Sequence, residues 1–484
     1  MKRLKSLSPQ PLWNYFEDIC QIPRPSKKEE KIMRFLLDFS KKNGLKARQD
    51  EIGNLLISKP ASAGREKDQV VILQSHVDMV CEKNSDTRHD FDTDAIQPFI
   101  ADGWVMAEGT TLGSDDGIGM AAQMAVLTSS DLLHGPIECL FTVDEETGLS
   151  GAFALQPGFL SGNILLNLDS EDEGELFIGC AGGIDSVGKL KYTPETLPAG
   201  SFAAKLEVKG LLGGHSGDDI NKNRGNANKI LNRFLIDASK LFDLRIAEFN
   251  GGNLRNAIAR EAFALVVVPH SQKENLIVEW NVFASEMEFE FERSEPKLKM
   301  LHQSVALPEF VIDKETQGRL LKLIAACPHG VLEMSSRMIG MVETSTNLAS
   351  IKFRENHEIV LTTSQRSEID SRKFMAAEMV ESAMLLAGAE VAHSEGYPGW
   401  TPNPDSEVAK IAAASYKKLF GNDPLVKSIH AGLECGLFLE KYPELDMVSF
   451  GPTIRGAHSP DERISIETVD KFWKLLVEVL ENIR

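Results

Sequence analysis

The sequence has few cysteines and no long apolar run. Six cysteines are scattered along 484 residues, and no two of them form a C-x-x-C pair. This spacing argues against a disulfide framework or a cysteine zinc site, and it is typical of a reducing compartment, so we expect a cytoplasmic protein. No run is long and apolar enough to predict a membrane span. The N-terminal residues are basic but lack the apolar core of a secretory signal.

Positive charge is also scarce. Lysine and arginine number 52 against 71 aspartates and glutamates, which gives a formal net charge of −19. Nucleic acids and anionic membranes attract basic surfaces, so we expect neither as a partner. The acidic residues are not concentrated in one block, which favours a solvated acidic surface. The length exceeds one ordinary core and predicts two domains or a large insertion.

The stretch from Val70 to Val80 changes character halfway along. Its first four residues are apolar and mostly β-branched, which predicts a strand that is buried on both faces. His76 and Asp78 follow, where the carboxyl end of such a strand meets a crevice. Their spacing places both side chains on one side of an extended chain. A metal-binding imidazole oriented by a carboxylate fits this pair, and a hydrogen-bonded structural histidine is the alternative.

Two later apolar stretches end in acidic residues as well. Residues 137–143 lead into Asp144, Glu145 and Glu146, and residues 163–168 lead into Asp169. Adjacent carboxylates after a buried strand repel one another unless a cation is present. A solvated acidic turn is the alternative. Three strand ends of the same kind favour a metal site at the carboxyl edge of a sheet.

The glycine-rich stretch Gly109–Gly119 contains two adjacent aspartates. It lacks both the Gly-Lys-Ser/Thr ending of a phosphate-binding loop and the GxGxxG order of a dinucleotide fold. Asp115 and Asp116 stand directly before an apolar helix expected at Ile118–Leu127. One aspartate suffices to cap a helix, so the other member of the pair is a candidate for a bridging metal ligand.

The order of the expected elements predicts an α/β fold with an insertion. Strands alternate with helices in residues 1–183 and again in 398–484, which predicts one domain with a mainly parallel sheet flanked by helices. Residues 184–397 have the alternating strands of an inserted α+β lid domain. A similar order of elements recurs within the lid, and residues 256–259 resemble residues 347–350. We therefore expect two similar halves.

The expected sheet edge gathers a set of ligands for two metal ions. Two imidazoles and three carboxylates suit a pair of divalent ions bridged by one carboxylate, with zinc, cobalt or manganese all acceptable. A further glutamate, Glu145, is left free as a general base for a metal-activated water. The expected ligands are His76, Asp115, Glu146, Asp169 and His458.

Six motifs in order give the chain a family resemblance. The segments are HVDMV, GSDDGIG, DEETGLSGA, NLDSED, GGHSG and GAHSPDE. Together they resemble the dinuclear zinc exopeptidases that include glutamate carboxypeptidase, aminoacylase and the dipeptidases. The resemblance covers nearly the whole chain and implies metal-dependent hydrolysis of dipeptides, with Xaa-His dipeptides among the substrates. An aminoacylase or carboxypeptidase acting on other N-acyl amino acids is one alternative, and a non-catalytic binding relative is another.

The resemblance also implies a role for each matching residue. In the catalytic domain, His76 and Asp169 would hold one ion, Glu146 and His458 would hold the other, and Asp115 would bridge the two. Asp78 would orient His76, and Glu145 would be the general base. It further implies a cis peptide between Asp115 and Asp116.

In the lid, the resemblance implies that His215 donates a hydrogen bond to the developing oxyanion. Asn256 and Arg366 would bind the carboxylate end of a small peptide substrate. In relatives with a short lid this histidine comes from a partner subunit. The doubled lid leads us to expect that each chain supplies its own His215, so that a homodimer is possible but not required.

Overall fold

The computed structural model describes residues 3–484 and divides the chain into two compact units. Unit 1 comprises the chain up to Gly179, then Pro402–Ser428 and Leu433–Arg484. Unit 2 comprises Cys180–Thr401 and the short segment Ile429–Gly432. The predicted boundaries lie after residues 183 and 397, and the short segment was predicted to belong to the catalytic domain.

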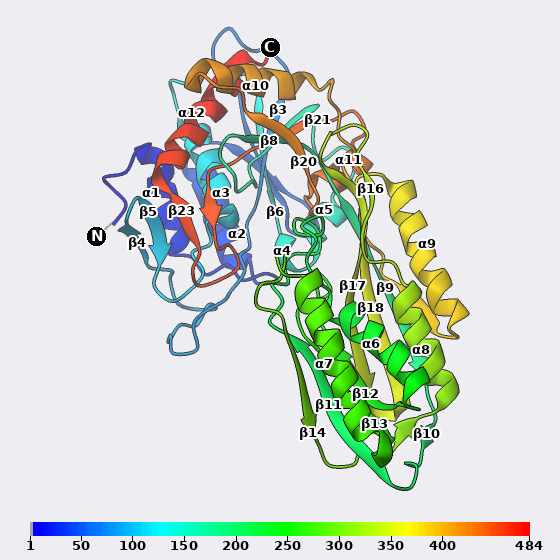
Figure 1. Cartoon of the computed structure of the whole chain (residues 1–484). Coiled ribbons are helices and arrows are strands. Elements are labelled where there is room, and N and C mark those ends of the chain that lie inside the picture. Colours follow the sequence, from blue (N-terminus) through cyan, green and yellow to red (C-terminus); the bar gives the residue numbers. More distant parts are fainter. Residues whose placement is uncertain (1–2) are drawn as a thin grey trace. The chain divides into compact units, whose positions relative to one another are not determined.

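Unit 1 is built on an eight-stranded sheet whose centre is parallel (Figure 1). The strand order is β1-β2-β6-β3-β7-β21-β8-β20, and the adjacent strands β6, β3, β7 and β21 run parallel. Strands β1, β2 and β8 pair antiparallel with their neighbours, so the sheet is mixed. The bounds are β1 Lys46–Gln49, β2 Leu55–Lys59, β3 Val71–His76, β6 Ile137–Thr142, β7 Ile164–Asn167, β8 Glu175–Cys180, β20 Leu425–Ile429 and β21 Asp446–Ser449.

The central strands are apolar because helices and neighbouring strands cover them. Every residue of β3 and β6 is buried, α3 packs against β3, and α10 packs against β21. Helices α1 and α12 bury one apolar stripe each, as their spacing of apolar residues dictates. The longer helices of unit 1 are α1 Gln10–Cys20, α2 Glu30–Lys42, α3 Ser114–Thr128, α10 Glu407–Phe420, α11 Cys435–Lys441 and α12 Ile466–Asn482.

A small four-stranded sheet in unit 1 joins two loops that are distant in sequence. Its order is β22-β23-β5-β4, with bounds β4 Pro98–Ala101, β5 Trp104–Ala107, β22 Ile454–Arg455 and β23 Arg463–Ser465. The antiparallel pairing of β23 with β5 aligns Arg463 with Met106. This pairing ties the loop between β22 and β23 to the segment that leads into α3.

Unit 2 is built on a nine-stranded antiparallel sheet with a repeated topology. The strand order is β14-β11-β13-β12-β17-β18-β9-β19, and β16 pairs with β17 off this path. The strand bounds are β9 Gly182–Lys191, β11 Ser201–Lys209, β12 Arg245–Gly251, β13 Ala262–Pro269, β14 Lys299–Ser304, β16 Gly330–Met334, β17 Val342–Arg354, β18 Glu358–Ser367 and β19 Glu390–His393. The helices are α6 Ala227–Leu241, α7 Lys273–Glu290, α8 Lys314–Ala326 and α9 Asp370–Leu386.

Each half of this sheet follows the same path of strand, helix, two strands, helix and strand. One half uses β11, α6, β12, β13, α7 and β14, and its strands lie in the order β14-β11-β13-β12. The other uses β9, α8, β17, β18, α9 and β19, in the order β19-β9-β18-β17. The halves meet where β12 pairs with β17. The first half is thus inserted between β9 and α8 of the second.

The short sequence likeness within the lid does not mark equivalent places in the two halves. Residues 256–259 lie in the loop between β12 and β13, whereas residues 347–350 lie inside β17. The expectation that this likeness marks equivalent positions in the two halves is wrong. The two halves share one core, since residues of two helices from each half are buried in one continuous cluster with residues of the sheet.

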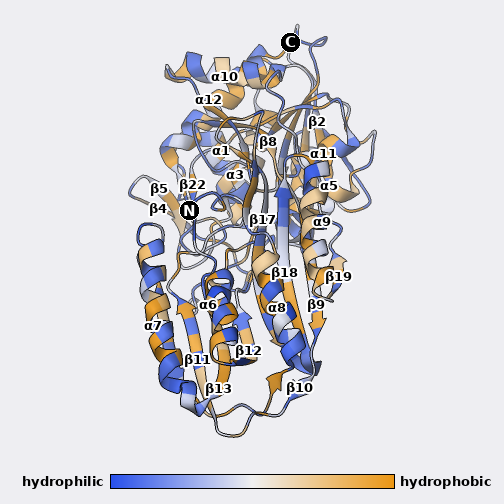
Figure 2. Ribbon diagram, turned by 45° about the vertical axis from the view of Figure 1, so that its right-hand side comes forward, coloured by the Kyte–Doolittle hydropathy of each residue, from blue (hydrophilic) through white to orange (hydrophobic). Residues whose placement is uncertain are grey.

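Helix α7, like α9, has apolar residues on both its buried and its exposed sides. It is coloured orange as well as blue along its length in Figure 2. Apolar residues occur on its buried side and on its exposed side, namely Leu276, Trp280 and Met287 on the former and Val278, Val282 and Phe289 on the latter. Over the described part of the chain, no helix combines the length and apolarity needed to cross a bilayer.

Candidate metal centre

Three neighbouring parallel strands deliver the candidate ligands to one edge of the sheet in unit 1. His76 is the last residue of β3. Glu145 and Glu146 follow β6 after two residues, in the short helix α4 (Glu145–Gly148), and Asp169 follows β7. The carboxyl ends of adjacent parallel strands open into one crevice, so these side chains meet there.

Asp115 stands between the two candidate histidines. Its Oδ1 lies 3.0 Å from His76 Nε2, and its Oδ2 lies 3.0 Å from His458 Nε2. Two groups of three side chains able to hold a cation therefore share this one carboxylate. Two facing oxygens, each directed at a different imidazole, are the arrangement that a bridging ligand needs.

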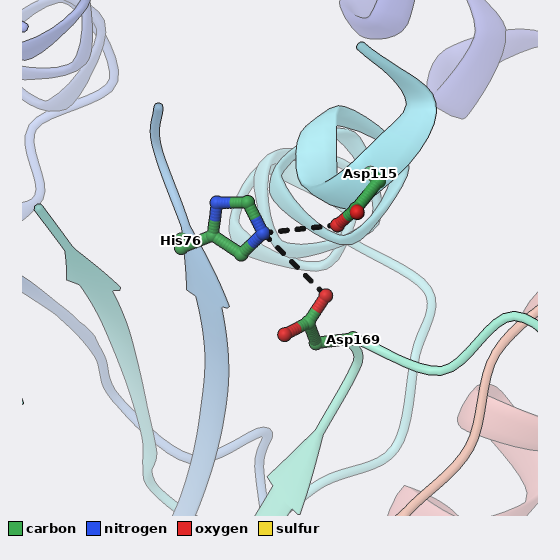
Figure 3. Close-up of side chains that lie close together, drawn as sticks. All are labelled: His76, Asp115 and Asp169. Atoms are coloured by element: carbon green, nitrogen blue, oxygen red, sulfur yellow. Dashed lines mark hydrogen bonds and ion pairs between the residues drawn. The ribbon is translucent and has the colours of Figure 1, made fainter. Parts of the chain in front are cut away.

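Each of the two groups is completed by a further carboxylate. Asp169 Oδ1 lies 3.5 Å from His76 Nε2, and Figure 3 shows that ring nitrogen between Asp169 and Asp115. Glu146 Oε2 lies 3.1 Å from His458 Nε2. All five predicted ligands are thus brought together from five separate parts of the chain.

The backbone around Asp115 is arranged for this position. Gly113, in the left-handed region with φ of 70°, precedes α3, and neither Asp115 nor Asp116 has helical dihedral angles. The peptide between the two aspartates is cis, which confirms the expectation from the resemblance. The regular part of α3 therefore begins after the aspartates, and Asp115 is free to face both histidines.

The electrostatics of the cluster fit bound cations. The carboxylates of Asp115 and Glu146 raise the pKa of His458 to about 11. Burial raises the pKa of Asp169 to about 7, although His76 opposes this shift. Glu146 Oε1 is buried and receives no hydrogen bond from residues 3–484. A buried cluster in which carboxylates outnumber imidazoles suits divalent ions of the zinc type, so the residues fit such ions.

Asp78 connects His76 with the turn that carries the two glutamates. Its carboxylate accepts hydrogen bonds from the backbone N–H groups of Glu145 and Glu146, at 3.0 and 3.2 Å, and lies 3.4 Å from His76 Nδ1. Burial opposes the charge of Asp78, but the contact with His76 and a hydrogen bond from Ser26 lower its pKa to about 2. Asp78 thus fixes both the imidazole ring and the start of α4.

Glu145 is half-buried beside the cluster. Burial, followed by the nearby carboxylates of Asp169 and Glu146, raises its pKa. Its side chain and those of His76 and Glu146 come close enough to form a third possible cation-binding group. A carboxylate with a raised pKa next to two candidate metal positions is suited to proton transfer.

A buried row of polar residues in the central strands was not predicted from the sequence. Gln74, Asn167 and Ser449 are Cα partners on β3, β7 and β21, and their side chains are hydrogen-bonded in that order. The fully buried Glu434 accepts hydrogen bonds at 2.7 Å from Gln74 Nε2 and from Thr142 Oγ1. The only signal was the presence of polar residues within runs that otherwise read as core strands.

Two buried ionisable residues near Asp115 were also missed. Arg24 and Glu462 bind backbone groups of the loop that precedes Asp115. Glu462 belongs to the segment GAHSPDE, in which a role was predicted for His458 alone. Arg24 lies in the connection between α1 and α2, where no pattern marked it.

In unit 2 the three candidate substrate-binding residues gather around Ser216. Its backbone N–H donates to the carbonyl of Asn256 at 2.8 Å, and its hydroxyl accepts a hydrogen bond from Arg366 Nε at 3.3 Å. Ser216 follows His215 directly, in the loop between β11 and α6. Arg366 also donates to the hydroxyl of Tyr397 at 3.1 Å.

The surroundings of His215 define the direction of its ring. Nδ1 accepts hydrogen bonds from the backbone N–H groups of Gly217 and Asp218, both at 3.3 Å. An imidazole nitrogen that accepts carries no proton in the neutral ring, so the proton resides on Nε2. The side chain is 33% exposed, and its Nδ1 also lies 3.6 Å from the carboxylate of Asp218.

Comparisons with known proteins agree with this geometry. The model of peptidase family M20/M25/M40 matches residues 72–482. A cytosol non-specific dipeptidase of Escherichia coli (strain K12) is 46% identical over 483 residues, which cover 100% of this chain and 99% of the relative. The crystal structure of an aminoacylhistidine dipeptidase from Vibrio alginolyticus has a TM-score of 0.89 and 47% identity, and the match covers 100% of this chain and 98% of that chain. Aminopeptidase PepT from Bacillus cereus ATCC 10987 shares the fold, with a TM-score of 0.57, 17% identity and coverage of 99% of each chain.

Proposed function

Because the chain belongs to peptidase family M20/M25/M40, we propose that it is a dipeptidase with two divalent metal ions per chain. Zinc is the proposed metal, and cobalt or manganese would also suit the ligands. The observation that carries the proposal is the pair of three-residue groups that share Asp115, each with one histidine. A binding-only relative would have no need of Glu145 beside a complete ligand set.

Each ion would have its own ligands in addition to the shared one. His76 and Asp169 would hold the first, Glu146 and His458 the second, and Asp115 both. Ions bound there would acidify a water molecule and polarise the scissile carbonyl.

The proton transfers fall to Glu145. Its carboxylate would accept a proton from the attacking water and return it to the amine that leaves. The raised pKa that burial gives this residue brings it nearer to neutrality, where a group can both accept and release a proton. Asp78 would keep the glutamate in place, since it binds the backbone N–H of Glu145.

The lid residues would bind the substrate. His215 would donate from Nε2 to the carbonyl oxygen as negative charge develops there, since its Nδ1 is occupied as an acceptor. Asn256 and Arg366 would bind the terminal carboxylate of the peptide, for which the guanidinium fork is well shaped. Ser216 and Tyr397 already orient Arg366.

The relatives suggest the substrates and the compartment. One similar protein is named a non-specific dipeptidase and the other an aminoacylhistidine dipeptidase, so we propose dipeptides in general with Xaa-His dipeptides among them. The cytosolic relative and the scattered cysteines, none of them in a C-x-x-C pair, support a cytoplasmic location. A homodimer is compatible with this function, and nucleic acids and membranes are not proposed as partners.

The test is a substrate panel combined with metal removal. Purified protein is assayed on dipeptides with and without C-terminal histidine, on tripeptides and on N-acetyl amino acids, before and after dialysis against a chelator. We expect dipeptide hydrolysis that is lost on chelation and restored by zinc or cobalt. Activity that persists in dialysed protein with almost no bound metal would contradict the metal mechanism. Preference for N-acetyl amino acids would instead favour an aminoacylase.

A further inference from the structure

The loop Leu112–Ser114 is held on both sides by buried charged side chains. It connects the segment after β5 to Asp115, the residue that faces both candidate metal histidines. Glu462 is 2% exposed and Arg24 is also 2% exposed. A charge so deeply buried requires hydrogen-bonded partners. Glu462 finds its partners in this loop, and Arg24 finds one there and two at the end of β3.

Glu462 binds the N–H side of the loop. Its Oε2 accepts hydrogen bonds from the backbone N–H groups of Leu112 and Gly113, at 2.7 and 3.0 Å. Its Oε1 accepts from the N–H and the hydroxyl of Ser114, at 2.7 and 2.5 Å. Four donors thus surround one carboxylate, and such charge-assisted hydrogen bonds are about twice as strong as neutral ones.

Arg24 binds the carbonyl side of the same loop. One terminal nitrogen donates to the carbonyl of Gly113, and the other donates to the carbonyls of Val77 and Asp78, at 2.9 and 2.5 Å. Val77 and Asp78 directly follow His76 at the end of β3. The guanidinium therefore joins the strand end that carries His76 to the loop that carries Asp115.

Space around the loop is filled by the arginine. A Cβ atom added to Gly113 would lie 2.6 Å from Arg24 Nη2 and 2.9 Å from Met79 Sδ. Gly113 also has a left-handed φ of 70°, which disfavours other residues. The close approach of Arg24 to the main chain thus depends on glycine at this position.

Glu462 also belongs to the segment that carries His458. The two residues are four positions apart, and the backbone N–H of Glu462 donates to the carbonyl of Ser459 at 3.1 Å. The side chain of His458 is 54% exposed, so packing alone holds it weakly. The turn that presents it is anchored at Glu462, because this carboxylate is fixed to the Asp115 loop.

We infer that Arg24 and Glu462 are positioning residues that set the spacing of His76, Asp115 and His458 and thereby the affinity for metal. The inference rests on the proposed function, because it assigns these two residues a role toward the proposed metal ions. Neither side chain is itself a ligand in this assignment. They act through backbone groups of the three ligand-bearing segments. Partners of this kind typically change metal affinity by about 10- to 100-fold when they are removed.

The test compares Glu462→Gln with Asp461→Asn, which removes one negative charge at the adjacent, exposed position. Metal-free protein is titrated with zinc in a metal buffer, and the dissociation constants are measured directly. We expect Glu462→Gln to weaken binding of at least one ion by about 10- to 100-fold, since an amide nitrogen cannot accept from the backbone N–H groups. The control should bind like the wild type.

Activity and unfolding measurements separate positioning from general damage. At saturating zinc we expect Glu462→Gln to recover most of its kcat, and its metal-free form should unfold within a few degrees of the metal-free control. Ser114→Ala removes one of the four hydrogen bonds and keeps the carboxylate, so it should weaken zinc binding less than Glu462→Gln does. This milder variant also serves if Glu462→Gln does not fold.

Two outcomes would decide the matter. Wild-type protein that binds no zinc would overturn the proposed function. If the wild-type protein binds two ions and Glu462→Gln binds them with unchanged affinity, this inference alone is overturned. If Glu462→Gln is unfolded, unchanged affinity in Ser114→Ala has the same consequence. Arg24→Lys is the complementary variant. Lysine keeps the charge, but its ammonium group lacks the planar fork with which arginine reaches three carbonyls. This variant should therefore also weaken zinc binding.

Discussion

The candidate residues of the two units are held in different ways. In unit 1 the ligand side chains face one another, as with His76 Nε2 at 3.0 Å from Asp115 and 3.5 Å from Asp169. In unit 2 the corresponding side chains are held by main-chain and hydroxyl groups, as with His215 Nδ1 and the N–H groups of Gly217 and Asp218. The first arrangement concentrates charge, whereas the second satisfies polar groups locally.

This difference indicates that the cluster in unit 1, and not the cluster around Ser216, depends on a cation. Buried carboxylates such as Asp115 and Glu146 face the same small space and would repel one another without positive charge between them. The cluster around Ser216 has its hydrogen bonds in place already. We therefore expect metal removal to change unit 1 and to leave unit 2 unchanged.

The largest effect is expected from Asp115→Ala. This change removes the one carboxylate common to both ligand groups, so metal content should fall below one ion per chain and activity should be lost. The measurement is elemental analysis of dialysed protein together with a dipeptide assay. Asp131→Ala, at an exposed position after α3, is the matched control and should keep both ions. Two bound ions in Asp115→Ala would show that the residue does not bridge them.

Glu145 and Glu146 should differ sharply although they are neighbours. Glu145→Gln should keep its metal and lose about 10²- to 10⁴-fold in kcat, the usual contribution of a general base. Glu146→Gln should lose one ion, because its carboxylate contacts His458 at 3.1 Å. Metal content and kcat are measured on the same preparations. The opposite pattern of metal loss would exchange the two roles.

The metal cluster could be predicted because it follows from strand ends. Apolar runs that end in His76, Glu145 and Asp169 mark parallel strands, and parallel strands in one sheet end at the same edge. The sequence therefore contained the fold class and the meeting of these side chains. The position of Asp115 came from the doubled aspartate before a helix, and its cis peptide came from the family resemblance.

The residues that hold the cluster could not be predicted in this way. Glu462 reaches a loop that is about 350 positions away in sequence, and Arg24 joins two segments that share no pattern with it. Contacts of side chains with backbone groups leave no periodic signal. The insertion of one lid half between β9 and α8 was hidden for a similar reason, because strand order depends on pairing between distant segments.

A smaller effect is expected from His215→Ala in unit 2. Removal of one donor to the developing oxyanion should lower kcat by about 10²- to 10³-fold. Zinc content should remain at the wild-type value, because none of the contacts of His215 within unit 2 involves a predicted ligand. His302→Ala, an exposed histidine on β14, is the control and should retain full activity. Loss of metal in His215→Ala would contradict the separation of the two sites.

The last experiment mixes subunits of two inactive variants, and we expect no gain in activity. The sheet of unit 2 contains two copies of one topology within a single chain, so we predict that each chain supplies its own His215 and needs none from a partner. Glu145→Ala and His215→Ala proteins, each inactive, are mixed under conditions that exchange subunits. If each chain completes its own site, the mixture stays as inactive as its parts. If His215 acts across a two-fold interface, half of the random pairs gain one complete site, and about a quarter of wild-type activity returns. Such a recovery would show that the doubled lid does not replace a partner subunit.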